Sequence, residues 1–492
     1  MRKCREVFLH PIVRDAHGRK MSKSLGNVID PLDVVKGISL AGLQGRLLQD
    51  SNLEAAERQR AADGQKRDYP QGIPECGTDA LRFALAAYMS QGRDINLDIL
   101  RVQGYRFFCN KIWNAARFSL TIFSSLLSTL DSTLAQNSYI TAVKPGSHDL
   151  DGSSDGATIS AVDVMFHAML TDRVSAPYTH LTRWYGHVTE LKKKQDADVN
   201  AALDQASKVK VSPIDSWILS RLSDAVATCN KAFQKYEFNT VTSACYNLWL
   251  YELCDVYLEC IKPVMSDGSL IEKANAARTL VTVLDVGLRL LSPFMPFLSE
   301  ELYQRLPCPD RAVSITVAPY PEQEVYDIHR SLPLEQDFEF VQKIYQTIRS
   351  VRSDYQVVKS QKTEVYVTCT DPHLSEVVTQ FSLTIRTLAY CSNIHLNETP
   401  PPGCAISTLS EKCSIHLLLQ GLIKVDKEIE RLNKKEEYLK QVIAKLKDQA
   451  AAEDYTTKVP ENVRTQNSEK LSEAEGELSR LPAALAALKL IQ

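Results

Sequence analysis

The chain has 492 residues, of which 44% are hydrophobic and 24% are charged, and its formal net charge is −3. This length allows three or four domains with cores of their own, in the composition of an ordinary soluble protein. The slightly negative charge excludes a uniformly basic nucleic-acid binder, so any RNA contact must come from local patches. No apolar run is long enough for a membrane span, and we expect no membrane partner.

The cysteines argue against a metal or redox site. The chain has twelve of them, and none forms a C-x-x-C pair. We therefore expect buried free thiols in a reducing compartment and no bound metal. His10 and His17 flank a basic loop, but nothing else in the sequence supports a ligand role for them.

That basic loop, at residues 20–24, reads KMSKS. Lysine ammonium groups and serine hydroxyls both suit phosphate oxygens. A solvated basic turn explains these five residues alone equally well, so the flanking sequence must decide. Asp30 is placed to cap a helix that begins at Pro31, with Asp33 three residues further on. The loop is therefore predicted to be anchored at its exit and free in its middle, which suits a gate that closes over a ligand.

The rest of residues 1–103 mixes short apolar runs with helical stretches. Residues 6–9 and 12–13 are typical of a strand or strand edge. Residues 38–76 form a polar, helix-forming insertion that returns through prolines and a glycine. A helix over 78–89 should then place Leu81, Leu85 and Tyr88 on one face.

Residues 104–330 are predicted to be helical throughout. A long first helix over 105–127 should turn Ile112, Trp113, Phe118 and Leu120 toward a core. The aromatic residues of this region favour a role in the core over one as base-stacking platforms. A Ser/Gly-rich stretch at 138–211 interrupts the region as an atypical insertion. Further helices are expected over 216–236, 238–262 (buried on several sides) and 274–291, with a short one capped by Ser299.

The C-terminal part divides into two predicted regions. Residues 331–420 read as a small α/β unit, with helices over 335–352 and 373–388 and strands over 364–368 and 414–419. No catalytic constellation is visible in it. Residues 421–492 hold two apolar seams with alternating spacings of three and four residues, joined by a break, which predicts an antiparallel coiled coil.

Three further strings give the loop its context: GTDALRF at 77–83, GRDIN at 92–96 and GYRFFCNKIWN at 104–114. Together with KMSKS and its flanks, RDAHGR at 14–19 and LGNVIDP at 25–31, they resemble the valine–tRNA ligases, a family of class I aminoacyl-tRNA synthetases. The isoleucine and leucine ligases share the loop and a related G-x-D-x-L-R helix, but not the GRDIN segment.

The resemblance implies a mainly α architecture in four parts. They are the C-terminal remnant of a Rossmann-like catalytic domain (1–103), a helical anticodon-binding bundle (104–330, including the insertion), a small α/β unit (331–420) and an antiparallel coiled-coil arm that binds tRNA (421–492). The resemblance also implies ATP as a substrate, accompanied by Mg²⁺. The implied partners are valine, the valine tRNA and other translation factors.

Site residues follow from the same resemblance. Catalysis is assigned to Lys20 and Lys23, and ATP binding to both lysines together with Ser22 and Ser24. In the arm, lysines on the outgoing helix are candidates for contacts with tRNA phosphates: Lys434, Lys435 and Lys440.

The family's His-Ile-Gly-His signature and its editing domain precede the KMSKS loop, and this sequence contains no counterpart of the signature. We therefore expect the C-terminal portion of a longer enzyme that is inactive alone, located in the cytoplasm or, alternatively, in mitochondria. Two other interpretations stay open: a non-catalytic tRNA-binding fragment, and a related class I ligase for isoleucine or leucine. The GRDIN and GYRFFCNKIWN strings argue against the last.

Overall fold

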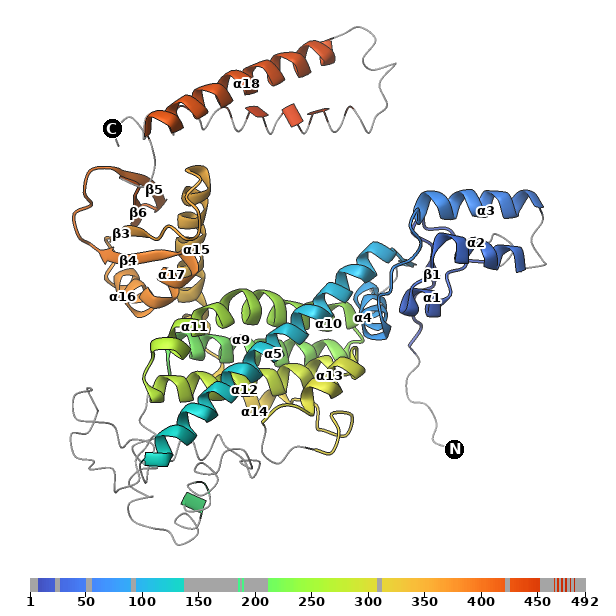
Figure 1. Ribbon diagram of the computed structural model, residues 1–492, viewed down its shortest axis with the longest axis horizontal. Coiled ribbons are helices and arrows are strands. Elements are labelled where there is room, and N and C mark those ends of the chain that lie inside the picture. The colour runs from blue at the N-terminus through green and yellow to red at the C-terminus, as the bar shows by residue number, and fades with distance from the viewer. Residues whose placement is uncertain are drawn as a thin grey trace. The chain divides into compact units, whose positions relative to one another are not determined.

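The structure is a computed structural model. It describes residues 8–22, 27–49, 55–89, 94–136, 211–307, 312–420 and 425–451, with residues 185, 188, 189 and separate positions between 464 and 482. The chain divides into two compact units, Met1–Glu335 and Gln336–Gln492, and each is described by itself (Figure 1). Most of the predicted insertion at 138–211 lies outside the described residues. The boundaries of the four predicted domains stay predictions.

The first unit opens with a short parallel ladder. Strand β1 (Val13–Arg14) pairs with β2 (Ile95–Asn96), so the two segments that flank the first helices lie side by side. The predicted strand is confirmed only at its last residue, because Leu9 and Ile12 are exposed and residues 8–12 form no strand. Residues 6–7 lie outside the described part. Strand β2 falls within GRDIN and was not predicted.

Four helices follow β1: α1 (Pro31–Lys36), α2 (Leu40–Gln49), α3 (Ala55–Asp68) and α4 (Thr78–Tyr88). The predicted polar insertion forms α2 and α3. The two ends of this insertion lie side by side, because Ile38 and Ile73 exchange backbone hydrogen bonds of 2.9 and 2.8 Å. Gly72 permits this closure: its φ is +85°, and a Cβ there would lie 2.2 Å from the Ile38 carbonyl oxygen. Helix α4 confirms the helix predicted over 78–89.

Helix α5 (Ile99–Gln136) is longer than predicted and buries one stripe. Trp113 is 38% exposed, so its predicted place in the core is wrong, and Phe118 and Leu120 are only partly buried. The stripe follows the helical period of 3.6 residues, and Trp113 stands about 100° away from Ile112 on the helix. Its buried positions include Val102, Phe108, Ile112, Ala115, Ala116, Ser119, Phe123, Leu126 and Leu130.

The bundle consists of α5 together with four further helices (Figure 1): α9 (Pro213–Gln234), α10 (Phe238–Tyr246), α11 (Leu258–Asp267) and α12 (Leu270–Leu291). A π-helix (Asn247–Tyr257) joins α10 to α11 and was not predicted. Trp249 is buried against Gly287, whose carbonyl accepts its indole N–H at 3.2 Å. The predicted core role of the bundle's aromatic residues is confirmed for Trp249 and for the fully buried Tyr257.

Helix α13 (Pro296–Tyr303) corrects one prediction. It begins at Pro296, so Ser299 lies inside it and is buried rather than acting as its cap. A residue from another helix fills the capping role. The carboxylate of Asp79, on α4, accepts the backbone N–H groups of Phe297 at 3.4 Å and Leu298 at 2.7 Å. The first unit ends with α14 (Gln323–Tyr326), a 3₁₀ turn (Asp327–His329) and the start of α15 (Leu332–Asp354).

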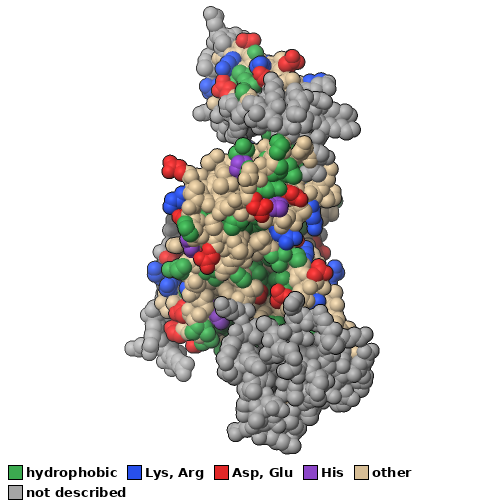
Figure 2. Space-filling view, turned by 90° about the vertical axis from the view of Figure 1, so that its left-hand side faces the viewer, with side chains coloured by type: hydrophobic (Ala, Val, Ile, Leu, Met, Phe, Trp, Pro, Cys, Tyr) green, Lys and Arg blue, Asp and Glu red, His purple; other side chains and the backbone are tan. Residues whose placement is uncertain are grey.

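The second unit holds a four-stranded sheet in the order β4-β3-β6-β5. Strand β3 (Thr363–Cys369) pairs in parallel with β4 (Cys391–Leu396) and antiparallel with β6 (Cys413–Leu418), which pairs antiparallel with β5 (Cys404–Ser410). Strands β3 and β6 were predicted, whereas β4 and β5 were not. The helix expected over 373–388 is two helices, α16 (Pro372–Gln380) and α17 (Ser382–Ala389). On the face drawn in Figure 2, charges of both signs and hydrophobic side chains are interspersed.

Helix α18 (Val425–Ala451) is the outgoing half of the predicted arm. Its seam residues Leu439 and Ile443 are buried, as is Ala474 from the expected return helix. Lys447 pairs with Glu475 at 2.7 Å, which places the two halves side by side at this level. The described residues therefore fit the predicted hairpin, while several seam positions, among them Leu422, Leu481, Leu485 and Leu488, lie outside them.

Candidate functional site

The KMSKS loop directly follows a tight turn at residues 15–19, which comes after β1. The N–H of Gly18 donates to the Asp15 carbonyl at 2.9 Å, and the N–H of Asp15 donates to the Arg19 carbonyl at 3.0 Å. Gly18 has a φ of +77°, a conformation that favours glycine. The turn reverses the chain, so that Lys20 bridges back to Arg14 in antiparallel fashion.

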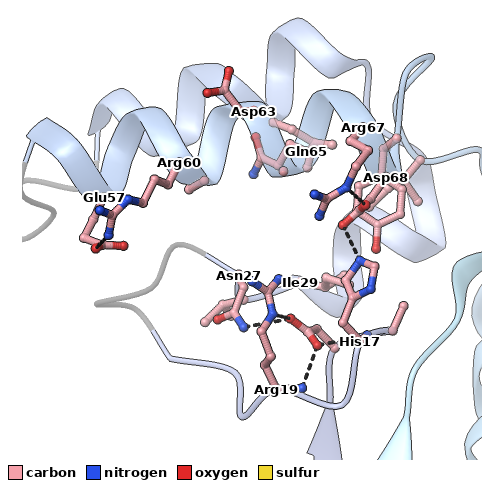
Figure 3. Close-up of a pocket in the computed structure, with 18 residues that line it drawn as sticks. His17, Arg19, Asn27, Ile29, Glu57, Arg60, Asp63, Gln65, Arg67 and Asp68 are labelled. Atoms are coloured by element: carbon pink, nitrogen blue, oxygen red, sulfur yellow. Dashed lines mark hydrogen bonds and ion pairs between the residues drawn. The ribbon is translucent and has the colours of Figure 1, made fainter. Parts of the chain in front are cut away.

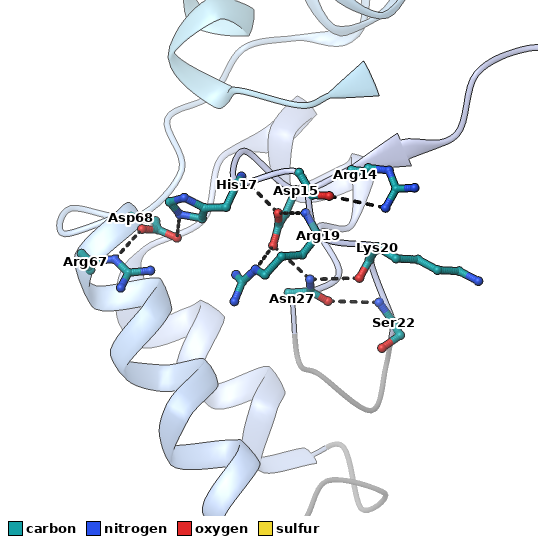
Figure 4. A network of polar contacts seen from close by, with 10 residues as sticks. Arg14, Asp15, His17, Arg19, Lys20, Ser22, Asn27, Arg67 and Asp68 are labelled. Carbon is teal, nitrogen blue, oxygen red and sulfur yellow. Dashed lines mark hydrogen bonds and ion pairs between the residues drawn. The ribbon is translucent and has the colours of Figure 1, made fainter. Parts of the chain in front are cut away.

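Asn27 closes the loop at its neck (Figure 4). Its amide nitrogen donates to the Asp15 carboxylate at 3.0 Å and to the Lys20 carbonyl at 3.2 Å. Its amide oxygen accepts the backbone N–H of Ser22 at 3.0 Å. One side chain on the outgoing arm thus holds two backbone groups on the incoming arm, and the loop between Ser22 and Asn27 is fixed at its base.

Asp15 is the centre of this neck. Asp15 is 5% exposed, and its carboxylate also accepts the N–H groups of His17 and Arg19 and the Arg19 guanidinium, at 2.8–3.1 Å. Burial alone would raise the pKa of Asp15, but the hydrogen bonds from Asn27 and Arg19 outweigh it and lower the pKa. Asp15 therefore stays ionised at neutral pH and serves as a fixed acceptor.

The exit of the loop is anchored as predicted. The Asp30 carboxylate accepts the N–H of Leu32 at 2.8 Å, and Pro31 is the first residue of α1. Asp33 has another role than the one its spacing suggests: it is buried and pairs with Arg46 of α2 at 2.6 Å. Arg46 also contacts Asp30 at 3.1 Å, so the cap and α2 brace each other.

Two of the four predicted ATP-binding residues lie among the described residues. Lys20 is exposed, and its ammonium group pairs with no residue that the structure describes. In Figure 4 its side chain extends away from Asn27. Ser22 follows it at the neck. Lys23 and Ser24 lie outside the described residues, so the structure brings Lys20 and Ser22 to the loop base and leaves the other two as predictions.

A pocket of about 360 Å³ lies between this loop base and α3 (Figure 3). His17 Nε2 contacts the Asp68 carboxylate at 3.0 Å, and Arg67 donates to the same carboxylate at 3.0 Å. Burial would raise the pKa of Asp68, but these two partners outweigh it and lower the pKa. Burial, with carboxylates nearby, raises the pKa of Tyr69 to about 12. Sequence reasoning missed this contact, because 51 residues separate His17 from Asp68.

Of the three lysines predicted to contact tRNA in the arm, the structure describes the side chains of two. Lys434 and Lys440 are exposed on α18, and Lys440 pairs with Glu436 at 2.6 Å within the helix. The side chain of Lys435 lies outside the described part. An exposed pair such as Lys440–Glu436 is weak, so a phosphate can displace the glutamate. Contacts of Lys434, Lys435 and Lys440 with tRNA therefore stay predictions.

No group of histidine, cysteine or acidic side chains among the described residues is arranged to hold a metal ion. Within the same residues, no helix combines the length and the apolar character that a membrane crossing requires. The ten cysteines that the structure describes are free thiols, eight of them buried.

Comparison with known proteins adds two family matches and a set of relatives. Residues 3–98 match the family described as tRNA synthetases class I (I, L, M and V), and residues 215–367 match the anticodon-binding domain of tRNA ligase. The chain is 41% identical to the valine–tRNA ligase of Takifugu rubripes, over 98% of this chain and 34% of that protein.

Two further relatives extend the range. The valine–tRNA ligase of Homo sapiens is also 41% identical, over 98% of this chain and 33% of that protein. The mitochondrial valine–tRNA ligase of Saccharomyces cerevisiae is 35% identical, over 99% of this chain and 38% of that protein. The chain thus spans about a third of the length of the curated relatives it matches.

Proposed function

We propose that this chain, which belongs to the valine–tRNA ligases of the class I tRNA synthetase family, supplies the ATP loop and the tRNA-binding regions of an enzyme that joins valine to its tRNA. Identity of 41% over 98% of the chain supports the choice of amino acid, which no described residue can select by itself. We place the enzyme in the cytoplasm, with the mitochondrion as second candidate because a mitochondrial relative matches over the same region.

In the first half-reaction, the valine carboxylate attacks the α-phosphate of ATP and pyrophosphate leaves. Negative charge grows on the leaving group, so cations that engage most strongly in the transition state lower the barrier. We assign this role to the ammonium groups of Lys20 and Lys23, with the hydroxyls of Ser22 and Ser24 as donors. Mg²⁺ is expected to enter with ATP as part of the substrate.

The neck formed by Asn27 and Asp15 is the observation that carries this assignment. A residue that must meet a departing phosphate needs a fixed base and a mobile tip. Asn27 fixes the incoming arm through the Lys20 carbonyl and the Ser22 N–H, while the exposed Lys20 side chain has no described partner to release before it meets phosphate. The fixed base of the loop therefore supports the assignment of Lys20 to the departing phosphate.

The tRNA side rests on two regions. The match to the anticodon-binding domain covers residues 215–367 and includes α9 to α13 of the bundle. The arm presents lysines on α18 whose contacts would go to phosphates, which carry no sequence information but position the RNA. We therefore propose that the bundle and the arm bind the valine tRNA while the loop serves the activation step.

Replacing Lys23 or Lys20 by alanine in the intact enzyme tests the catalytic assignment. Valine-dependent ATP–pyrophosphate exchange should fall by about 10²–10³-fold for Lys23→Ala, as for a lost oxyanion donor. Valine binding should be nearly unchanged, because the contact is made chiefly in the transition state. Lys36→Ala, an exposed lysine in the last turn of α1, is the matched control. Equal losses of rate and valine affinity, or a similar loss for Lys36→Ala, would contradict the assignment.

A further inference from the structure

A second concave site lies in the first unit, away from the loop. It is a groove of about 320 Å³ between α4, α5, α10 and the start of the π-helix. Its walls mix aromatic rings, small polar side chains and one charged group, the guanidinium of Arg101. The lining residues are Phe83, Ala87, Arg101, Gly104, Tyr105, Thr242, Ser243, Tyr246 and Asn247.

Gly104 is the residue in this groove that the fold does not explain. It lies inside α5, where a glycine costs about 0.5–1 kcal/mol relative to alanine. Gly287 contrasts with it, because a Cβ there would lie 3.1 Å from the Trp249 ring. A Cβ on Gly104 would meet nothing within 4 Å, and its φ is not in the left-handed region. No described neighbour requires the absence of a side chain, and the space that Gly104 leaves open is the groove.

The rings beside Gly104 offer a surface for a planar group. Tyr105 and Tyr246 lie edge to face with centroids 6.2 Å apart, and Tyr246 and Tyr251 continue the row at 5.9 Å. Tyr251 is 55% exposed although it is a large aromatic residue. The π-helix that carries Tyr251 begins at Asn247, a groove residue, and such segments occur frequently at functional sites.

The charge of the groove selects an anionic ligand. Arg101 is its single charged lining residue, and its guanidinium lies 4.4 Å from the centre of the Tyr88 ring. Arg101 also hydrogen bonds to Tyr88 and Tyr105, and because a guanidinium has five N–H donors in a planar fork, others remain for a phosphate. Ser243 and Asn247 supply neutral donors and acceptors for the edge of a base.

We propose that this groove holds one unstacked nucleotide of the tRNA, with its base against Tyr246 and its phosphate toward Arg101. Sequence-tolerant binding of single nucleotides uses aromatic rings and arginine in this combination, whereas an RNA duplex is too wide for such a pocket. The site deepens the proposed tRNA binding and rests on it. It assigns an RNA contact to the junction of α4 and α5, separate from the lysines of the arm.

Filling the groove from Gly104 is the direct test. Gly104→Gln should weaken binding of a valine tRNA transcript to the 492-residue chain by about 5-fold or more, from the 1–3 kcal/mol that one stacked base contributes. Gly45→Gln is the matched control, because Gly45 also lies inside a helix with no atom within 4 Å of its Cβ, and it is not a groove residue. Gly104→Ala should raise the melting temperature, which shows that α5 tolerates a side chain there.

Fluorescence anisotropy at several salt concentrations separates the outcomes. Arg101→Gln should reduce the slope of log affinity against log salt by about one, the mark of one lost phosphate contact. Equal affinity of Gly104→Gln and the parent, or equal weakening by Gly45→Gln, would overturn the groove proposal while the parent still binds tRNA. A parent chain that does not bind the transcript would instead overturn the proposed tRNA-binding function, and the groove proposal with it.

Discussion

Replacing Asn27 by alanine should open the neck of the KMSKS loop. The change removes one hydrogen bond to the Asp15 carboxylate and two to the backbone of Lys20 and Ser22. A bond to a charged group contributes about 1.5–3 kcal/mol and a neutral one about 0.5–1.5 kcal/mol. The low end of their sum is about 2.5 kcal/mol, and because Asn27 is only partly buried we take a slightly smaller value, about 2 kcal/mol. That corresponds to an increase of about 30-fold in the population of the open neck.

Limited trypsin digestion measures this population. Cleavage after Lys20 requires the neck to open, because the Lys20 carbonyl is held by Asn27. When opening and closing are fast, the cleavage rate follows the open population, so the rate after Lys20 should rise about 30-fold in Asn27→Ala. Cleavage after Lys36, in the same unit, serves as the internal reference.

Asn230→Ala controls for a general loss of stability. The Asn230 amide also donates two hydrogen bonds, to the carbonyls of Val226 at 2.8 Å and Pro321 at 2.9 Å, within the bundle. This variant should leave cleavage after Lys20 unchanged relative to Lys36. A change of less than about threefold in Asn27→Ala, or an equal change in Asn230→Ala, would refute the reasoning that Asn27 holds the neck.

Three other predictions test contacts elsewhere in the chain. The partners of Asp68 lower its pKa, so its contribution to stability is present above the ordinary carboxyl pKa of about 4 and is lost as pH falls through the lowered value. Asp68→Asn should therefore reduce the melting temperature, measured by circular dichroism, at pH 7 but not near pH 2. Asp79→Ala should cost about 1–2 kcal/mol in urea unfolding as a lost helix cap. Asp79→Asn should cost less, since burial raises the pKa of Asp79 and the amide oxygen still accepts. Deleting residues 421–492 should raise the dissociation constant for tRNA and flatten its salt slope, and an unchanged affinity at low salt would contradict the role assigned to the arm.

The sequence predicted a structural feature correctly where that feature depends on residues close to one another along the chain. The Asp30 cap, Pro31 at the start of α1 and the seam of α18 all depend on residues within a few positions of one another. Helix α5 shows the limit of residue type as a guide. Trp113 was assigned to the core because it is large and aromatic, but the buried stripe passes through Ile112, and Trp113 instead lies under the Arg305 guanidinium at 5.9 Å.

Two strands of the small sheet escaped prediction for a different reason. Strand β4 has one buried residue, Cys391, and strand β5 has one, Ala405. An outer strand with so little burial has no regular alternation of apolar and polar residues, which is the signal that identified β3 and β6. The outer strands exist because β3 and β6 offer backbone partners, and that information is tertiary.

The contacts that shape the candidate site are also tertiary. Asn27 and Asp15 are 12 residues apart, and Asp79 and Leu298 are 219 residues apart. The KMSKS loop could be identified from the sequence, because its five residues and the flanking strings that distinguish it from a basic turn are adjacent along the chain. The neck depends on hydrogen bonds across a loop, and the pocket under α3 and the groove at Gly104 depend on how helices pack, so no spacing rule along the sequence could have located them.

These contacts join the loop to the bundle through a short structural path. The carbonyls of Val34 and Val35, in α1, accept the N–H groups of Cys76 at 3.0 Å and Gly77 at 3.1 Å, where α4 begins. Asp79 then caps α13, and Arg82 donates to the Pro293 carbonyl at 3.0 Å.

The path from the loop exit to the bundle therefore bypasses α2 and α3. These helices leave the path at Ile38 and rejoin it at Ile73, where the two backbones are hydrogen bonded to each other. They act on the loop base through side chains, chiefly Asp68 on His17 and Arg46 on Asp33. An element attached in this way can vary in length without breaking the connection between the KMSKS loop and the bundle, while its side chains still contact the base of the loop.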